Sequence, residues 1–450
     1  MNRGKSCVLV ILFLCFSSSL ALANGLNLNS LGTRALTMGG AFVGLADDFS
    51  AIYWNPAGMA FFSKKYFGFY GTDVIPAQEF TLDADIPPNP VLRLVGAKTE
   101  TKHYLSGLAA YYHPVSEKVV VGFGVYVPSG LGASWNGEDF RTLSNDNPFL
   151  DWRSKIGLVT FSPGIGFQVS EKLAVGVTFN VNYGIFNLAM HAGAAPNPAP
   201  PPAEIDLGQY EDSMKGWGYG TTIGVLFKPI DKLSIGATFR SASKVKFKGE
   251  STISGMAFLG LSETSDTERN VTWPMWLAVG VAFQPVEGLT LTGDLQWTQW
   301  SKIGVIETTF VDPSWAAMMS LSGDDKRPMN WDDALQIRFG AEYRFNNYAF
   351  RAGYYYDPSP APDTTLNVLL PSHDFQVITA GFGYSLNGLQ LDFGIEFLMG
   401  KDRSVPFDIV LNPTPPPDFF IDMPADYETA MPGAYKMNIL VPTISVSYRF

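Results

Sequence analysis

The sequence predicts an all-β fold, in which a closed barrel of 14 antiparallel strands crosses a membrane. Three observations lead to this prediction. Apolar and polar residues alternate over runs of about 10 to 15 positions, six very short turns join these runs in pairs, and a long segment follows each pair. A large soluble β protein is the alternative class, but it does not require short turns at one end and long segments at the other.

The composition excludes several other classes of protein. The chain has 450 residues, a formal net charge of −11, 14% aromatic residues and only 16% charged residues. Disordered chains have few aromatic residues, and nucleic-acid-binding proteins are usually basic, so we expect neither disorder nor a nucleic-acid partner. Beyond the N-terminus, no stretch approaches the roughly 20 apolar residues that a membrane-spanning helix needs.

The N-terminus predicts export. Arg3 and Lys5 precede an apolar stretch that is too short to span a bilayer, and Ala21-Leu22-Ala23 has the pattern of a cleavage site, so residues 1–23 are expected to be a secretory signal peptide. An uncleaved membrane anchor is the alternative. Both cysteines lie within this peptide, and the mature chain should therefore contain no disulfide.

The short turns define six hairpins. The turns lie at Val115-Ser116-Glu117, Ser170-Glu171-Lys172, Ile230-Asp231-Lys232, Val286-Glu287-Gly288, Asn346-Asn347 and Asn387-Gly388. Their strands are predicted at 102–113 with 118–127, 154–169 with 172–186, 215–229 with 232–246, 272–285 with 288–302, 331–345 with 348–357, and 373–386 with 389–400. One further strand is expected at each end, near 64–72 and 435–450, and pairing of these two strands would close the sheet.

Seven long segments connect the hairpins at the opposite end. They lie near 73–101, 128–153, 187–214, 247–271, 303–330, 358–372 and 401–434. An even number of strands with short turns on one side and long loops on the other is typical of outer-membrane barrels.

The two faces of each strand fit lipid outside and water inside. Between 335 and 345, Leu335, Ile337 and Phe339 share one face, whereas Arg338 and Glu342 share the other. An arginine on the lipid face at the middle of the bilayer costs roughly 2–4 kcal/mol, so the charged face is predicted to line the lumen. The chain ends in an amphipathic strand with Phe450 as its last residue, which is typical of the signal that the barrel-assembly machinery recognises.

Four segments carry a resemblance to a known family. They are NGLNLNSLGTRALTMGGAFVGLADDFSAIYWNPAGM from Asn24 to Met59, GLTLTGDLQWTQWS from Gly288 to Ser301, NWDD from Asn330 to Asp333, and RAGYYYDP from Arg351 to Pro358. With these segments the mature chain resembles the FadL/TodX family of outer-membrane transporters of long-chain fatty acids and hydrophobic compounds. The resemblance implies a barrel over residues 64–450, plugged by an N-terminal hatch over residues 24–63, in the bacterial cell outer membrane. It also implies a monomer among outer-membrane lipid and lipopolysaccharide.

The composition of the hatch agrees with a plug. Residues 24–63 are rich in small residues and hold only three charges, so they suit a polar lumen better than a flexible tail. In the family, the motif that matches Asn55, Pro56 and Ala57 lies beside a kink in the third strand, where substrate leaves sideways. The third strand is expected at Lys118–Val127, and Gly122 and Gly124 are its predicted weak points.

The resemblance implies a hydrophobic ligand and passive transport. Uptake would proceed by loop capture, passage to a pocket against the hatch, movement of the hatch and lateral release into the bilayer. Aromatic residues of two loops are the expected capture groove, although scattered exposed aromatics are the alternative interpretation. The groove candidates are Trp135, Phe140, Phe149, Leu150, Trp152, Phe186, Leu188 and Met190.

One lumen arginine is a candidate anchor for a carboxylate. Strand parity directs Arg240, Arg338, Arg344 and Arg351 inward, together with several acidic residues. Most of these charges are expected to pair across strands, because an unpaired charge in a plugged lumen is costly. Arg240 faces no obvious acid on its neighbouring strand, so it is the predicted anchor, which would favour fatty acids over neutral hydrocarbons.

Other activities have little support in the sequence. The four histidines fall in no metal-ligand spacing, and no motif of a nucleophile or a phosphate-binding loop is present, so we expect no enzyme, metal or cofactor. Uptake of aromatic hydrocarbons through the same fold, an outer-membrane barrel hydrolase and an open diffusion porin remain as alternatives. The porin would lack a plug.

Overall fold

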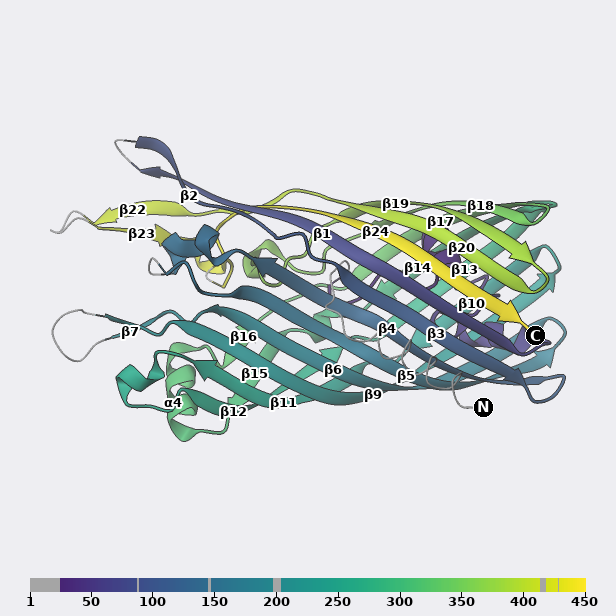
Figure 1. The fold of residues 1–450 in the computed structure, drawn as a ribbon, viewed down its shortest axis with the longest axis horizontal. Coiled ribbons are helices and arrows are strands. Elements are labelled where there is room, and N and C mark those ends of the chain that lie inside the picture. The colour runs from purple at the N-terminus through teal and green to yellow at the C-terminus, as the bar shows by residue number, and fades with distance from the viewer. Residues whose placement is uncertain (1–24, 87–88, 145–146, 197–203, 413–417, 428) are drawn as a thin grey trace, which may run out of the picture.

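The predicted barrel is present in the structure, which is a computed structural model (Figure 1). It describes residues 25–86, 89–144, 147–196, 204–412, 418–427 and 429–450. Twenty strand segments form one sheet, and this sheet closes because β1 (Tyr66–Ile86) pairs with β24 (Gly433–Arg449) along its edge. Six of the 14 wall strands consist of two segments each. The expected signal peptide at 1–23 lies outside the described residues.

The remaining wall strands follow in chain order around the barrel. They are β2 with β3 (Asn89–Lys98, Tyr104–Pro114), β4 (Val119–Trp135), β5 (Trp152–Ser170), β6 (Leu173–His191), β9 (Gln209–Ile230), β10 with β11 (Leu233–Arg240, Ser243–Ile253), β12 with β13 (Thr264–Trp273, Trp276–Val286), β14 with β15 (Leu289–Thr298, Val305–Phe310), β16 with β17 (Lys326–Pro328, Ala334–Phe345), β18 (Tyr348–Asp357), β19 (Phe375–Leu386) and β20 with β21 (Leu389–Gly400, Arg403–Val405).

The prediction of short turns at one end is confirmed, whereas the long segments are more ordered than expected. All six predicted turns join neighbouring wall strands. At the other end, several wall strands continue into the segments predicted as irregular, and that end also carries small hairpins and helices (Figure 1). These are β7 (Ala194–Pro196), β8 (Glu204–Asp206), β22 (Asp408–Asn412), β23 (Asp418–Asp422), α4 (Pro313–Ser322), η2 (Gly137–Leu143), η3 (Met256–Leu259), η4 (Trp300–Lys302), η5 (Asp363–Thr365) and η6 (Ala425–Tyr427).

The two faces of the wall have the predicted polarity. On β17, Leu335 and Phe339 are 49% and 55% exposed on the outside, whereas Arg338 and Glu342 are buried inside. The same alternation surrounds the barrel with apolar side chains, as a surface in contact with lipid requires. Among the described residues, no helix is both long and apolar enough to cross a membrane.

Residues 25–63, which we call the inner segment, lie inside the short-turn half of the barrel. They contain α2 (Thr33–Thr37), α3 (Ala51–Trp54) and η1 (Pro56–Phe61), and nearly all of their side chains are buried. Wall glycines allow this close approach. A Cβ added at Gly353 would lie 2.1 Å from the Gly39 nitrogen, and one added at Gly44 would lie 2.6 Å from the Gly280 carbonyl group. The backbone of the segment therefore rests directly on the wall.

Gly353→Val should loosen the inner segment without opening the barrel. The added side chain would occupy the space of the Gly39 backbone. The hydrogen bonds that join β18 to its neighbours are made by the backbone and do not involve a side chain at position 353. In planar bilayers we expect the variant to pass a steady ion current and the parent protein to be nearly silent. Gly293→Val is the matched control, since a Cβ there meets only an ordinary contact of 3.6 Å. A silent Gly353→Val barrel would contradict the role of this contact.

Candidate functional site

Buried ion pairs attach the inner segment to the wall. Arg34 of α2 donates to both oxygens of Glu342 on β17, from Nε at 2.8 Å and from Nη2 at 2.9 Å. Glu342 also accepts from Arg351 Nε at 2.6 Å, and Arg351 Nη1 donates to Asp392 at 2.7 Å. Ion pairs thus join these lumen charges across strands, as predicted for most of them, and one partner belongs to the inner segment. Arg338 instead donates to the Gln336 side chain and the Gly39 carbonyl.

Acidic and amide side chains provide further attachment points. Asp294 on β14 accepts from the Val43 nitrogen at 2.8 Å. The Asn55 amide donates to the Val43 carbonyl at 2.9 Å and to the Val225 carbonyl of β9 at 3.0 Å, and its oxygen accepts from the Ala57 nitrogen. Pro56 begins η1 directly after this cap. The Asn55-Pro56-Ala57 motif therefore both caps a short helix and fastens it to β9. Near the short-turn mouth, burial raises the pKa of the Asp48 carboxyl, and the charge of Arg34 opposes this shift.

Most of the predicted capture residues lie in one apolar cluster in the long-loop half of the lumen. The buried members are Trp135, Phe140, Leu150, Trp152, Phe186 and Leu188, and Met190 packs at the edge. Phe140 stacks on Trp152 with ring centroids 4.8 Å apart, and Trp135 Nε1 donates to the Val368 carbonyl at 3.0 Å. Phe149 lies apart from them and is 90% exposed. The cluster is a packed core beneath the loops rather than an open groove.

Arg240 lies in the lumen where the long-loop half meets the inner segment. Its Nη2 donates to the Tyr53 carbonyl at 2.7 Å and its Nε to Thr222 Oγ1 at 3.3 Å. The guanidinium lies over the Tyr53 and Trp276 rings, 4.3 and 5.1 Å from their centroids. Within the described part of the chain, no carboxylate pairs with it. It borders a cavity of about 50 Å³ that Asn27, Asn180 and Pro128 also line.

The irregular position of the third wall strand is a proline rather than a glycine. In the pairing of β4 with β5, Tyr126 faces Thr160 but Ser129 faces Leu158, so β4 contains one extra residue at Val127 and Pro128. Gly122 and Gly124 stay in regular register with both neighbouring strands. A β-bulge of this kind bends a strand and interrupts its ladder.

The bulge leaves a break in the wall. The ladder between β3 and β4 ends at Leu108 with Tyr126, and the next pairing on this side of β4 is an isolated bridge between Thr99 and Trp135. Between these points β4 bonds the inner segment instead. The Leu28 nitrogen donates to the Pro128 carbonyl and the Gly130 nitrogen donates to the Leu26 carbonyl, both at 3.0 Å. We call this break the side opening.

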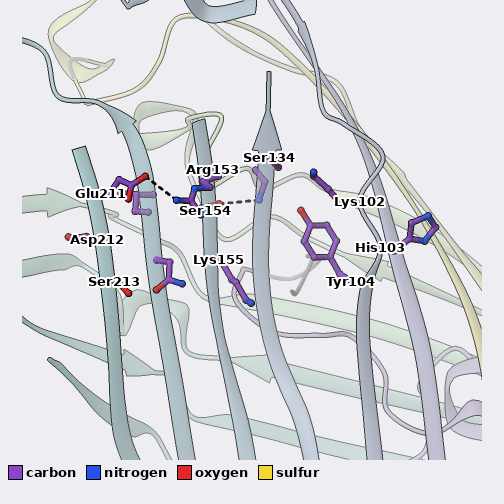
Figure 2. A pocket seen from close by; sticks show the side chains of 13 residues that line it. Lys102, His103, Tyr104, Ser134, Arg153, Ser154, Lys155, Glu211, Asp212 and Ser213 are labelled. Carbon is purple, nitrogen blue, oxygen red and sulfur yellow. Dashed lines mark hydrogen bonds and ion pairs between the residues drawn. The ribbon is translucent and has the colours of Figure 1, made fainter. Parts of the chain in front are cut away.

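A hollow of about 320 Å³ adjoins the side opening (Figure 2). Lys102 and His103, between β2 and β3, and Tyr104, the first residue of β3, border one side of it. Residues of β4, β5, β6 and β9 border the other side, among them Arg153 and Lys155. Figure 2 shows Arg153 joined to Glu211, while the ammonium group of Lys155 lies apart.

Comparison with known proteins agrees with this architecture. Residues 14–450 match the family described as outer membrane protein transport protein (OMPP1/FadL/TodX). The chain belongs to this family. It is 24% identical to the long-chain fatty acid transport protein of Salmonella typhi over 431 residues, which are 86% of this chain and 90% of that protein. The resemblance noted in the sequence is thereby confirmed.

Solved structures of this family have the same fold. A FadL homologue of Pseudomonas aeruginosa superposes with a TM-score of 0.72 at 17% identity, covering 95% of this chain and all (100%) of that chain. The toluene transporter TbuX of Ralstonia pickettii superposes with a TM-score of 0.63 at 18% identity, covering 94% and 99%. As a FadL/TodX family member with a β-barrel fold, the protein resides in the bacterial outer membrane, as predicted.

Sequence reasoning missed two features of the lumen. The bulge had a signal in Val127-Pro128, since a proline within a strand marks an edge or a bulge. Arg269 of β12 pairs with Asp212 of β9 at 2.6 Å inside the lumen, and the alternation around Arg269 would have directed it inward. Among the described residues, no group of three His, Cys, Asp or Glu side chains has the arrangement of a metal site.

Arg34→Gln should detach part of the inner segment. The change removes one partner of a buried ion pair, which typically costs about 3–5 kcal/mol. In a protein with both cysteines replaced by serine, a reporter cysteine at the buried Met38 should react with a water-soluble maleimide at least about 100-fold faster. Arg93→Gln, which breaks an exposed pair with Asp83, should leave the rate unchanged. Equal rates for both variants would contradict the attachment by Arg34.

Proposed function

We propose that this protein takes up long-chain fatty acids passively across the outer membrane, by loop capture, movement of the inner segment as a hatch, and lateral release into the bilayer. The observation that carries the proposal is Arg240, a lumen guanidinium without a carboxylate partner among the described residues, lying between an apolar cluster and the hatch. A fatty acid has this combination of charge and chain. Its carboxylate can form a charge-assisted pair, while each buried methylene contributes roughly 0.8 kcal/mol.

Each step of the route uses a feature of the described chain. The acyl chain enters the apolar cluster when the loops above it separate. The cluster residues that receive it are Trp135, Phe140, Leu150, Trp152, Phe186, Leu188 and Met190. Arg240 then holds the carboxylate beside Tyr53 of the hatch. Residues 26–28 cover the side opening from within, so their withdrawal from Pro128 and Gly130 would connect the lumen to the lipid.

Three competing functions make different use of these features. Uptake of aromatic hydrocarbons, for which relatives such as TbuX are named, would need the apolar cluster but not Arg240. An open porin would need a lumen free of the inner segment, whereas Gly39, Gly44 and Asn55 lie against the wall. A hydrolase would need a nucleophile beside a base, and the relatives of this chain are transporters.

The proposal also covers export, membrane assembly and oligomeric state. Residues 1–23 direct export and are removed, Phe450 presents the end of β24 to the assembly machinery, and the barrel works as a monomer. The last of these agrees with a lumen that one chain fills by itself.

Arg240→Ala should reduce oleate uptake about 10-fold or more and leave toluene uptake unchanged, because only oleate carries a carboxylate. Uptake is measured with both radiolabelled substrates in cells that produce equal amounts of folded barrel. Arg240→Lys keeps the charge and should retain most of the oleate uptake. Equal loss of both substrates indicates damage to the fold, and unchanged uptake of both removes Arg240 from the route.

Deletion of Pro128 should close the side opening. Without the extra residue, β4 can pair with β5 in continuous register and extend its ladder toward β3. We expect uptake of oleate and of toluene to fall together by about 10-fold or more, while heat-modifiable migration in gels still reports a folded barrel. Pro128→Ala keeps the extra residue and should transport like the parent protein. Normal uptake by the deletion variant would exclude this exit.

A further inference from the structure

A row of unpaired lysines lies on the outer face of the barrel. Lys155 of β5, Lys215 of β9 and Lys246 of β11 belong to the outward-facing positions of their strands. Among the described residues none of the three has a carboxylate partner. Two of the outward acids near them are paired with other cations, Glu211 with Arg153 and Glu268 with Lys248, and Glu250 of β11 lies diagonally across from Lys215 without an ion pair to it.

The three lysines lie at a common height on the wall. Lys155 is 15 residues from Ser170 at its short turn, Lys215 is 15 residues from Ile230, and Lys246 is 13 residues beyond Leu233. Because all short turns mark the same end of the barrel, these similar distances along similarly tilted strands place the three lysines at nearly the same height. We call Lys155, Lys215 and Lys246 the lysine row.

Lysines of neighbouring strands face each other at the row. Lys215 lies directly opposite Lys248 in the β9–β11 ladder, and the two share the outward face. Like charges in directly opposite positions destabilise a sheet. Lys246 adds a third charge two residues from Lys248 on the same face. Glu268 pairs with Lys248, and Glu250 follows two residues further along the same face, but Lys155, Lys215 and Lys246 have no direct ion pair among the described residues and are free to contact an external anion.

An aromatic band places the row relative to the membrane. Trp217, Tyr219 and Phe179 are 51%, 60% and 51% exposed, and they lie on the side of the row nearer to the short turns. The rings of Trp217 and Tyr183 are 4.9 Å apart, and those of Phe179 and Tyr219 are stacked. Exposed aromatics of this kind mark the boundary of the hydrocarbon layer, and long loops face the cell exterior. The lysine row therefore lies at the level of the outer-leaflet headgroups.

The wall is also hollowed at this level. The cavity of about 320 Å³ beside the side opening is bordered by Lys155 and Arg153, by Lys102 and His103 across from them, and by the outward Asn187 and Ser213 between β5 and β9 (Figure 2). Cations and neutral donors thus border this cavity, and its two carboxylates, Glu211 and Asp212, are already paired with Arg153 and Arg269.

The exposed cations around β1 are paired, unlike those of the lysine row. There the exposed cations are neutralised within the protein, Lys98 by Glu79, Arg93 by Asp83 and Lys436 by Asp402. Lys98, Arg93 and Lys436 therefore differ from the lysine row, because each of them has an ion-pair partner within the protein.

We propose that the lysine row and the adjoining hollow form a binding site for lipopolysaccharide, in which the phosphates of lipid A contact the lysines and the acyl chains lie along Trp217, Tyr219 and Phe179. Lipopolysaccharide fits because it presents several phosphates at the top of its acyl chains, at the height of the row. The lysine row lies on the outside of the barrel, and the hollow adjoins the side opening rather than the cavity beside Arg240.

The test is a binding titration followed by native mass spectrometry of the full mature protein in detergent. The probes are bis-phosphorylated lipid A, lipid A without its phosphates, and phosphatidylglycerol. We expect the parent protein to prefer bis-phosphorylated lipid A to both other lipids. The triple variant Lys155→Gln, Lys215→Gln, Lys246→Gln should bind it on the order of 100-fold more weakly, since each lysine near an anionic membrane surface contributes roughly fivefold.

A matched triple variant controls for net charge. Lys98→Gln, Lys326→Gln, Lys436→Gln removes the same charge from exposed positions on β2, β16 and β24, and it should bind lipid A like the parent protein. Equal weakening by both triple variants would overturn the proposal, and so would unchanged binding by the lysine-row variant. Equal affinity for phosphatidylglycerol or for dephosphorylated lipid A would also overturn it, because the lysines would then not recognise the phosphates of lipopolysaccharide. Heat-modifiable migration confirms that each variant is folded.

Discussion

The hydrocarbon layer offers no hydrogen-bond partners, and this constraint governs the whole structure. Backbone groups that face lipid must be paired within the protein, so the sheet has to close, and the pairing of β1 with β24 achieves this. The side opening at β4 is the stretch where the wall ladder is interrupted. There the inner segment supplies the missing partners, because Leu26 and Leu28 bond the backbone on both sides of Ser129. The segment is therefore a part of the wall as well as a plug.

This double role explains how firmly the inner segment is attached. It bonds β4 at residues 26–28, pairs with Glu342 through Arg34, and bonds β9 through Asn55. Withdrawal from β4 alone would leave the Pro128 carbonyl and the Gly130 N–H without partners, and each unsatisfied buried group costs about 1–3 kcal/mol. A closed side opening is thus the resting state. Movement of residues 26–28 does not require the ion pair of Arg34 to break, because that contact lies elsewhere on the segment, at β17.

The strands of the wall could be predicted from the sequence, whereas the contacts inside the lumen could not, and the reason is physical. Turn residues and the period of two are local signals, and a single register shift would expose every charged residue to lipid, so the strands and their inward faces were predictable. The contacts that close the site join residues far apart in the chain, such as Trp135 with Val368 and Arg34 with Glu342. No local pattern specifies such partners. The loop aromatics were correctly grouped in sequence, but whether they form a groove or a packed core depends on residues 366–370, which no periodicity connects to them.

The cavity beside Arg240 connects ligand binding with the side opening. Its volume is about 50 Å³, whereas pockets that hold small molecules usually measure about 300–1,000 Å³. If Arg240 anchors a fatty acid as proposed, the surrounding residues have to move apart. Two of these residues are Asn27 of the inner segment and Pro128 of the bulge, and these two segments close the side opening. A ligand that fits only when they have separated binds the open conformation more tightly and shifts the population toward it. Occupation of the cavity would by itself favour the exit, without any source of energy beyond the binding of the ligand.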